Sequence, residues 1–308
     1  MSEHHRQARK WSRRTLLWAA LSYIKETSTT NERPNVLILD EPELYLHPSA
    51  VREACRVLYE LPGESNWQVM ITTHSPAFVD FSRDNTTIVR VERDLSGEIK
   101  GTTLFRPQRA KLDDNDRRLL KLLNLCDPYV AEFFFGGHSI IVEGDTEYTA
   151  FKYIIANNPE QFKDVHIIKA RGKATIVSLV RVLNHFGTSY AILHDSDYPT
   201  LINGNRNSAW ATNQNIINAV NEHKQPSRVR LIASLKNFEF AFLTKEVSEE
   251  KPYNALLELS GNHELAENVR LLLLALINHS APIPSGCLEW SSLEELERHY
   301  QDRVTTYS

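Results

Sequence analysis

Short apolar runs alternate with amphipathic segments along the second half of the chain. Four of these runs are expected to be strands, and they cover 139–144 (SIIVEG), 164–170 (DVHIIKA), 189–195 (SYAILHD) and 228–234 (RVRLIAS). The segments between them have helical spacing, and they cover 146–158, 173–186 and 207–223. Continuous apolar strands that alternate with helices predict a parallel sheet covered on both faces. From Leu243 onward the pattern predicts helices only, interrupted at 281–286 (APIPSG).

The first part of the chain has a separate strand and helix pattern. Strands are expected at 35–40 (NVLILD), 67–73 (WQVMITT) and 87–93 (TIVRVER), and helices at 13–26 and 49–61. Residues 106–124 begin polar and become helical, which is typical of a linker that leads into a docking helix. We therefore expect an α/β segment at 1–105, a linker and docking helix at 106–138, a second α/β domain at 139–242 and a helical region at 243–308.

Length and composition fit a protein of two globular domains. The chain has 308 residues, of which 42% are hydrophobic and 24% are charged. No apolar run reaches the roughly 18 residues that a membrane helix needs, and the N-terminus lacks a signal-peptide pattern. Three scattered cysteines suit a reducing cytosol, so we expect a cytoplasmic protein. The net charge of −4 permits a nucleic-acid partner if a face is locally basic, as in 1–14 or 106–111.

Acidic residues and a histidine follow two strands of the first segment. Asp40 is the last residue of the first strand and Glu41 follows it, and His74 follows the second strand. In phosphate-handling folds an aspartate at this position holds Mg²⁺ and the next glutamate positions the attacking water. A histidine at the neighbouring strand end can reach a γ-phosphate. In order and spacing, LILDEPELYLHP and ITTHSP resemble the Walker B, D-loop and switch-histidine segments of ABC-type ATPases.

The chain lacks the P-loop that would complete such an ATPase site. A P-loop needs glycines whose N–H groups wrap the phosphates, followed by a lysine. The first glycine of this chain is Gly63, and ARGKAT at 170–175 has neither the leading glycine nor a Ser or Thr after the lysine. We expect that this chain alone does not bind ATP in the usual way. Three interpretations stay open. The chain is a fragment of a longer protein, or a partner supplies the nucleotide-binding lobe, or the ATPase half is a relic that serves as a scaffold.

Carboxylates are concentrated after two strands of the second domain. Glu143 lies at the end of the strand at 139–144 and Glu147 follows it, while Asp195 ends the strand at 189–195 and Asp197 follows two residues later. Strands of a parallel sheet deliver their carboxyl-end residues to one edge, so these four side chains are expected to converge. Crowded carboxylates need a counter-charge, and oxygen ligands select Mg²⁺ or Mn²⁺. The alternative is an ordinary acidic loop. Gly144 is expected to let the backbone turn sharply between strand and helix.

The order of these acids resembles the Toprim pattern, with a glutamate after the first strand and D-x-D after the third. A Toprim domain joined to part of an ABC-type ATPase resembles the OLD (overcoming lysogenization defect) family of ATP-dependent endonucleases. The same pairing occurs in the nuclease subunit of the Gabija phage-defence system. The resemblance implies that Glu143, Glu147, Asp195 and Asp197 bind two divalent metal ions. It also matches two further residues, namely Glu239 in NFEFAFL as a metal ligand and Lys251 in EKPYNAL as the group that stabilises phosphate charge.

The resemblance implies an endonuclease that hydrolyses DNA with two Mg²⁺ or Mn²⁺ ions. Glu143 is either a metal ligand or the general base, and the sequence does not separate these roles. Arg171 and Lys173 are candidate phosphate contacts at a helix N-terminus, with solvated surface residues as the alternative. ATP is expected as a cofactor only if missing sequence or a partner supplies a Walker A lobe. Toprim and ABC-type domains tend to work as dimers, so by analogy we expect a dimer or larger homo-oligomer, with a defence-system partner as a further possibility.

Other functions stay open at this point. The chain could cleave RNA or tRNA, or it could be a non-catalytic subunit whose ATPase-like lobe docks a partner in a defence complex. A topoisomerase or primase is disfavoured because we find no separate domain for strand passage or polymerisation. Tyr148 and Tyr198 flank the acids and are candidate nucleophiles, although both also fit packing roles. Substrate sequence, nicking versus double-strand cutting and the trigger do not follow from the sequence.

Overall fold

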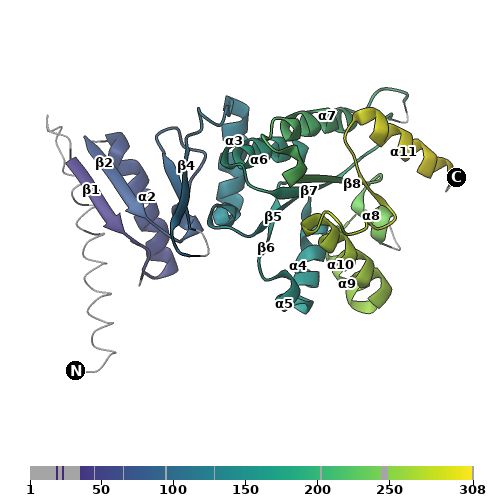
Figure 1. Cartoon of the computed structure of the whole chain (residues 1–308), viewed down its shortest axis with the longest axis horizontal. Coiled ribbons are helices and arrows are strands. Elements are labelled where there is room, and N and C mark those ends of the chain that lie inside the picture. Colours follow the sequence, from purple (N-terminus) through teal and green to yellow (C-terminus); the bar gives the residue numbers. More distant parts are fainter. Residues whose placement is uncertain are drawn as a thin grey trace. The chain divides into compact units, whose positions relative to one another are not determined.

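The computed structural model describes residues 35–44, 46–64, 66–93, 96–127, 129–201, 203–243 and 249–306, together with Ala19 and Tyr23 (Figure 1). The helix expected at 13–26 and the basic segment at 1–14 lie outside the described residues, except that Ala19 and Tyr23 are helical. Packing divides the chain into two compact units, Met1–Asp80 and Phe81–Ser308. Each unit is described by itself.

The first unit contains a pair of parallel strands covered by one helix. Strands β1 (Asn35–Asp40) and β2 (Trp67–Thr72) pair in register from Asn35 opposite Trp67 to Asp40 opposite Thr72. Between them runs α2 (Pro48–Glu64), whose buried face packs on the strands, and the short turn η1 (Pro76–Phe78) follows β2. Because the two strands are parallel and in register, Asp40 and Thr72 reach the same edge of the pair.

The second unit begins with a hairpin and a capped helix. Strands β3 (Ile88–Arg93) and β4 (Ile99–Phe105) are antiparallel. We did not predict β4 from the sequence, because its glycine and polar residues obscure the alternation. Helix α3 (Asp114–Cys126) begins at a capping box in which Asp113 and Asp116 each accept a backbone N–H of the other. The turn η2 (Val130–Phe135) then leads into the central sheet.

The centre of the second unit is a five-stranded sheet in the order β6-β5-β7-β8-β9. The elements in chain order are β5 (His138–Val142), α4 (Asp145–Asn157), α5 (Pro159–Phe162), β6 (Val165–Lys169), α6 (Lys173–Phe186), β7 (Tyr190–Asp195), α7 (Ser208–Asn221), η3 (Pro226–Arg228) and β8 (Val229–Ser234). The first four strands of the sheet are parallel. The mainly parallel α/β fold predicted from the sequence is thus confirmed.

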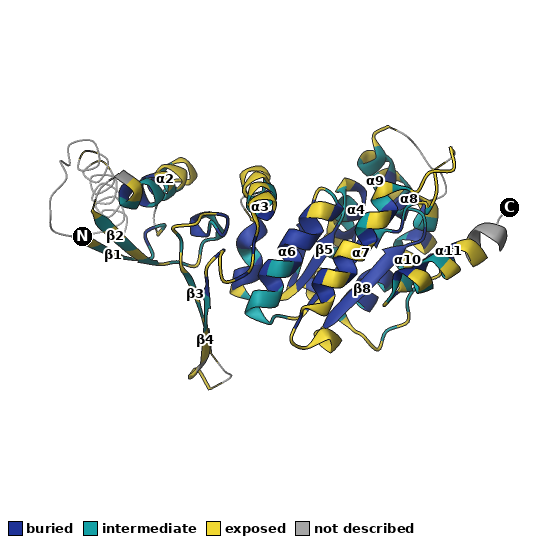
Figure 2. Ribbon diagram, turned by 90° about the horizontal axis from the view of Figure 1, so that it is seen from above, coloured by how far each residue is buried: buried dark blue, intermediate teal, exposed yellow. Residues whose placement is uncertain are grey.

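Helices cover both faces of this sheet. Figure 1 shows α6 and α7 on one face and α4, α9 (Lys251–Gly261) and α10 (His263–Ile277) on the other. The four parallel strands are mostly buried, and β8 is buried along its whole length, as the dark blue β5 and β8 in Figure 2 show. Burial of continuous apolar strands supplies most of the driving force for this layered fold. Among the described residues, no helix has both the length and the apolar character to cross a lipid bilayer.

The prediction that only helices follow Leu243 is wrong. After α8 (Phe238–Phe242), α9 and α10, the strand β9 (Cys287–Glu289) pairs antiparallel with β8, and α11 (Leu293–Thr306) follows. Three residues are too few to produce a recognisable alternation. Long-range contacts hold β9 instead, since the buried guanidinium of Arg230 on β8 lies 3.2 Å from the carboxylate of Glu289.

Gly137, just before β5, is expected to tolerate no side chain. Its φ is +83°, and a Cβ there would lie 2.5 Å from Cδ2 of His166 and 2.6 Å from the carbonyl oxygen of Asp164. Gly137→Ala should therefore lower the free energy of unfolding by about 1–3 kcal/mol or more, measured by urea denaturation. Gly136→Ala is the matched control, because φ is +116° but no described heavy atom lies within 4 Å. Equal losses in the two variants would contradict the steric argument.

Candidate active site

The carboxyl ends of β5, β7 and β8 meet at one edge of the central sheet. Glu143 follows β5, and Asp195 is the last residue of β7. The backbone N–H of Asp195 donates to Oε2 of Glu143 over 3.1 Å, so the two strand ends are joined directly. The carboxylate of Asp195 in turn accepts the backbone N–H of Phe238, which begins α8, over 2.8 Å. Sheet topology thus brings together acids that lie 52 residues apart in the chain.

Gly144 makes room for the second glutamate. Its φ is −129°, so the backbone makes no turn that only glycine could adopt, in contrast to our expectation. A Cβ at Gly144 would lie 3.1 Å from Oε2 of Glu147, however, which is a tight approach. Glu147 is in the first turn of α4 and is buried. The glycine therefore serves the placement of the Glu147 carboxylate over the N-terminus of its own helix.

Glu239 and Lys251 join the same edge from the C-terminal region. The hydroxyl of Thr146 donates to Oε1 of Glu239 over 2.9 Å. The ammonium group of Lys251 lies 3.4 Å from the same oxygen. Glu239 is almost fully buried, whereas the Lys251 side chain is 42% exposed. This lysine can therefore reach both the carboxylate and a ligand that approaches from solvent.

Lys173 is buried against Asp197. The two side chains form an ion pair, and Nζ of Lys173 also lies 3.4 Å from the carbonyl oxygen of Ala209. This differs from the exposed lysine that we considered from the sequence. Arg171, two residues earlier, is exposed. The N–H of Gly172 donates to the carbonyl oxygen of Glu143 over 3.1 Å, which fixes this turn beside the acids.

The site concentrates negative charge in a region shielded from water. The pKa of Glu143 is raised to about 6, mainly by burial; Asp197 acts in the same direction, whereas Lys173 and the Asp195 N–H oppose the shift. Burial raises the pKa of Glu147 to about 8, with Glu143 and Glu239 acting in the same direction. The pKa of Asp195 is raised by burial and by the same neighbouring carboxylates. Metal-free protein at neutral pH therefore keeps protons that a bound cation would displace.

The donor chemistry fits a divalent cation. All candidate ligands are carboxylate oxygens, which hard ions such as Mg²⁺ and Mn²⁺ prefer. The residues concerned are Glu143, Glu147, Asp195, Asp197 and Glu239. Among the described residues, Asp197 forms an ion pair with Lys173, and Glu239 forms one with Lys251. Within the described ranges, no three Asp, Glu, His or Cys side chains already surround one point as a metal would require. Binding of an ion here requires rearrangement of these side chains.

Backbone strain is concentrated at this edge. Of the six non-glycine residues with positive φ in the described part of the chain, four belong to it, namely Arg171, Asp197, Lys236 and Glu250. Asp197 keeps φ at +61° while its N–H donates to the carbonyl oxygen of Lys236 over 2.9 Å. Residues in the left-handed region persist where surrounding structure determines them, and they cluster at functional sites.

A buried histidine and tryptophan position Asp195 and were missed in the sequence. Nδ1 of His194 lies 2.8 Å from the carbonyl oxygen of Asp195, and Nε1–H of Trp290 donates to Nε2 of His194 over 3.1 Å. These bonds require the neutral tautomer with the proton on Nδ1, and burial lowers the pKa of His194 to about 3. No sequence signal identifies this pair, because its members lie 96 residues apart.

The first unit brings together the three ATPase-like residues. The hydroxyl of Thr72 donates to the carboxylate of Asp40, and the N–H of Glu41 donates to the carbonyl oxygen of Thr72 over 3.0 Å. Nε2 of His74 lies 3.5 Å from Oε1 of Glu41, with the imidazole 84% exposed. Glu41 has a φ of +42°, a further strained position next to a candidate site.

Glu43 connects the loop after β1 to the loop after β2. Its Oε1 accepts the hydroxyl of Thr73 over 2.7 Å and the backbone N–H of His74 over 2.9 Å. We did not single out this residue in the sequence, although its position in DEPE was the available signal. Glu43 therefore positions the histidine loop relative to Asp40 and Glu41.

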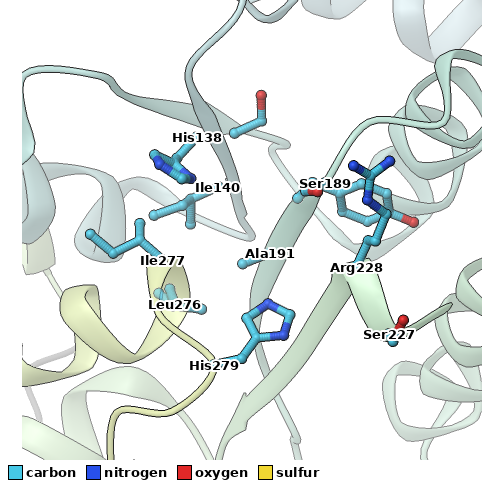
Figure 3. Close-up of a pocket in the computed structure, with 11 residues that line it drawn as sticks. His138, Ile140, Ser189, Ala191, Ser227, Arg228, Leu276, Ile277 and His279 are labelled. Atoms are coloured by element: carbon cyan, nitrogen blue, oxygen red, sulfur yellow. The ribbon is translucent and has the colours of Figure 1, made fainter. Parts of the chain in front are cut away.

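A cavity of about 270 Å³ lies at the opposite end of the central sheet (Figure 3). It is lined by residues at the amino ends of the strands, including His138 of β5, Tyr190 of β7 and Arg228 before β8. The candidate active site is at the carboxyl ends and is therefore separate from this cavity.

Two family models match the chain. Residues 12–79 match an AAA ATPase domain, and residues 134–197 match the Toprim domain of overcoming lysogenization defect (OLD) protein-like sequences. The second match covers Glu143, Glu147, Asp195 and Asp197. The predicted resemblance, an ATPase-type segment followed by an OLD-like Toprim domain, is confirmed.

Three curated nucleases are similar to this chain. It is 25% identical over 238 residues to the Old nuclease of Escherichia phage P2 and 30% identical over 170 residues to the OLD nuclease of Thermus scotoductus. It is 28% identical over 144 residues to the Endonuclease GajA of Bacillus cereus. These alignments cover 74%, 54% and 42% of this chain but only 40%, 31% and 21% of the relatives. The aligned part is thus less than half of each relative.

Proposed function

Because this chain pairs an AAA-type ATPase segment with an OLD-like Toprim domain, we propose that it is part of a metal-dependent endonuclease that hydrolyses DNA phosphodiester bonds. The observation that carries the proposal is the set of buried and half-buried carboxylates at the sheet edge, with the raised pKa values of Glu143, Glu147 and Asp195. Burial of several like charges disfavours folding, and a cation-dependent activity would account for keeping them. A role in phage defence is part of the same proposal, by family resemblance.

Each residue at this edge has a proposed role. Glu147, Asp195, Asp197 and Glu239 hold two Mg²⁺ or Mn²⁺ ions, which supply Lewis-acid stabilisation of phosphate charge and an activated water when bound. Glu143 ligates an ion or accepts the proton of the attacking water, since a pKa of about 6 suits a base near neutral pH. Lys251 stabilises negative charge on the phosphate, because its ammonium group is partly exposed beside Glu239. Arg171 contacts the nucleic-acid backbone from the exposed turn.

The first unit has a proposed role in nucleotide control. Asp40, Glu41 and His74 supply the Mg²⁺-binding and water-positioning half of an ATP site, and other sequence or a second subunit supplies the phosphate-binding loop. Under this proposal ATP regulates the assembled protein, and the chain by itself does not hydrolyse ATP. The assembly is a dimer or larger oligomer.

The proposal is tested by incubating the purified chain with supercoiled plasmid in Mg²⁺ or Mn²⁺ without ATP. We expect nicked or linear product that EDTA abolishes. Glu143→Gln should slow cleavage on the order of 100-fold, the range for loss of a general base. Glu160→Gln is the matched control, because this glutamate is exposed on α5 away from the acids.

Three results would change the assignment. Equal cleavage by the Glu143 and Glu160 variants would exclude the carboxylate site as the source of activity. Cleavage of RNA or tRNA in place of plasmid would replace DNA as the substrate. A stable complex with another subunit and no metal-dependent cleavage of any nucleic acid would favour the non-catalytic assembly role.

A further inference from the structure

Two exposed aromatic rings stand directly beside the acidic edge. Tyr198 follows Asp197 in sequence, and Phe240 follows Glu239. Tyr198 is 45% exposed and Phe240 is 38% exposed, although neighbouring residues on β8 and α8 are buried. Large aromatic rings left open to water at the border of a polar site indicate a surface that contacts a ligand.

One lysine side chain joins the two rings. Nζ of Lys236 lies 4.5 Å from the ring centroid of Phe240 and 5.7 Å from that of Tyr198. Both distances are within the range of a cation–π contact. The carbonyl oxygen of Lys236 also accepts the N–H of Asp197. This bond joins the loop after β7 to the loop after β8, and both the rings and the acidic edge lie in or next to these two loops. The two rings therefore border the same patch of surface.

The ring of Tyr198 is supported by two further aromatic side chains. It packs edge-on against Tyr300 of α11 with centroids 6.3 Å apart, and Tyr300 packs on the buried Trp210 of α7 at 5.8 Å. Because Tyr300 and Trp210 are buried, Tyr198 is supported by the core. A supported ring loses little side-chain entropy when a flat ligand stacks on it.

We propose that Tyr198, Phe240 and Lys236 form a stacking site for an unpaired base of the DNA strand that is cut. The substrate class is therefore DNA that contains a single-stranded segment. This inference rests on the proposed nuclease function and names its substrate. In a duplex the faces of each base are covered by the neighbouring pairs, whereas an unpaired base offers its face to an aromatic ring. Lys236 places positive charge beside the rings, where a nucleotide also carries its phosphate.

The inference is tested by binding, without any need for cleavage. Fluorescence anisotropy with labelled oligo(dT) and with a blunt duplex of equal length is measured in Ca²⁺. Tyr198→Ala and Phe240→Ala should each weaken oligo(dT) binding on the order of tenfold, the effect of losing one stacked base, and should leave duplex binding unchanged. Tyr198→Phe keeps the ring and should bind as the unsubstituted chain does.

Tyr129→Ala is the matched control, since this tyrosine is 65% exposed but precedes η2, which leads to the amino end of β5. Equal losses in the Tyr129 and Tyr198 variants would overturn the inference. So would equal losses for oligo(dT) and duplex, or no binding of oligo(dT) by the unsubstituted chain. The proposed function is judged separately by plasmid cleavage and Glu143→Gln. If the Tyr198→Ala and Phe240→Ala variants still cleave plasmid and bind oligo(dT) as the unsubstituted chain does, the stacking site is excluded. The nuclease proposal is then unaffected.

Discussion

Replacing Asp195 with asparagine should abolish cleavage and at the same time raise the stability of the metal-free protein. Asp195 is half-buried at the end of β7, and desolvation together with the carboxylates of Glu147, Glu143, Glu239 and Asp197 raises its pKa. Loss of one proposed metal ligand should slow cleavage by at least ~1,000-fold, the upper range for removal of one transition-state contact. Asparagine is neutral without binding a proton, so the folded variant avoids both the repulsion within the cluster and the cost of taking up a proton, and the free energy of unfolding should rise.

The substitution is conservative in shape. Oδ1 of Asp195 accepts the N–H of Phe238 over 2.8 Å, and the side-chain oxygen of asparagine can accept the same bond. Because the amide has nearly the volume of the carboxylate, no cavity forms. Stability should therefore rise while activity falls, because the clustered carboxylates destabilise the metal-free fold and are kept for the proposed function.

The measurements are plasmid cleavage and thermal unfolding in EDTA. Asp164→Asn is the matched control, since this aspartate is exposed before β6, and it should change neither quantity. A lower melting temperature for the Asp195 variant would mean that the carboxylate stabilises the metal-free fold, which contradicts the repulsion argument. Unchanged cleavage would remove Asp195 from the proposed metal ligands.

The strand pattern was sufficient to predict which acids lie at one edge. Continuous apolar runs identify parallel strands, and parallel strands carry their final residues to the same side of a sheet. Glu143 and Asp195 follow from this rule alone, and their direct hydrogen bond agrees with it. The positions of Glu239 and Lys251 came only from family resemblance, because α8 and α9 have no periodic signal that fixes them relative to the sheet.

The remaining features depend on contacts between distant parts of the chain. Lys173 is basic and polar in sequence, yet the ion pair with Asp197 makes its burial acceptable. Trp290 reaches His194 only because β9 adds to the sheet beside β8. A single sequence contains no periodicity that encodes such pairs. Residues that hold the acids in place were therefore the part of the site that the sequence did not predict.

Stability of the metal-free protein should fall as the pH rises from about 4.5 to about 8. The pKa of Glu147 is raised from an ordinary value of 4.5 to about 8, and that of Glu143 to about 6. Between these limits the folded state holds protons that the unfolded state has already lost, so a rising pH favours unfolding. Both glutamates contribute from 4.5 to about 6, and of these two only Glu147 continues to about 8. Asp195, whose pKa is also raised, acts in the same direction. Each unit of pKa difference corresponds to about 1.4 kcal/mol.

Divalent ions should reverse this trend. Mg²⁺ or Mn²⁺ binds ionised carboxylates of the folded state, so the gain in melting temperature on adding metal should increase with pH across the same interval. The measurement is thermal unfolding at a series of pH values, in EDTA and in excess metal. Other groups contribute to the pH dependence of both proteins, so the Glu147→Gln variant is followed in parallel, and the difference between the two curves isolates the glutamate.

The pH dependence separates a metal site from an ordinary acidic cluster. If the carboxylates only form internal ion pairs with Lys173 and Lys251, metal adds no stability and the curves with and without it coincide. If they form a cation site, the two curves diverge increasingly as the pH rises from about 4.5 to about 8, and the divergence shrinks in Glu147→Gln. Because this test needs neither a substrate nor the nucleotide-binding lobe, it examines the carboxylate chemistry in the chain as it is.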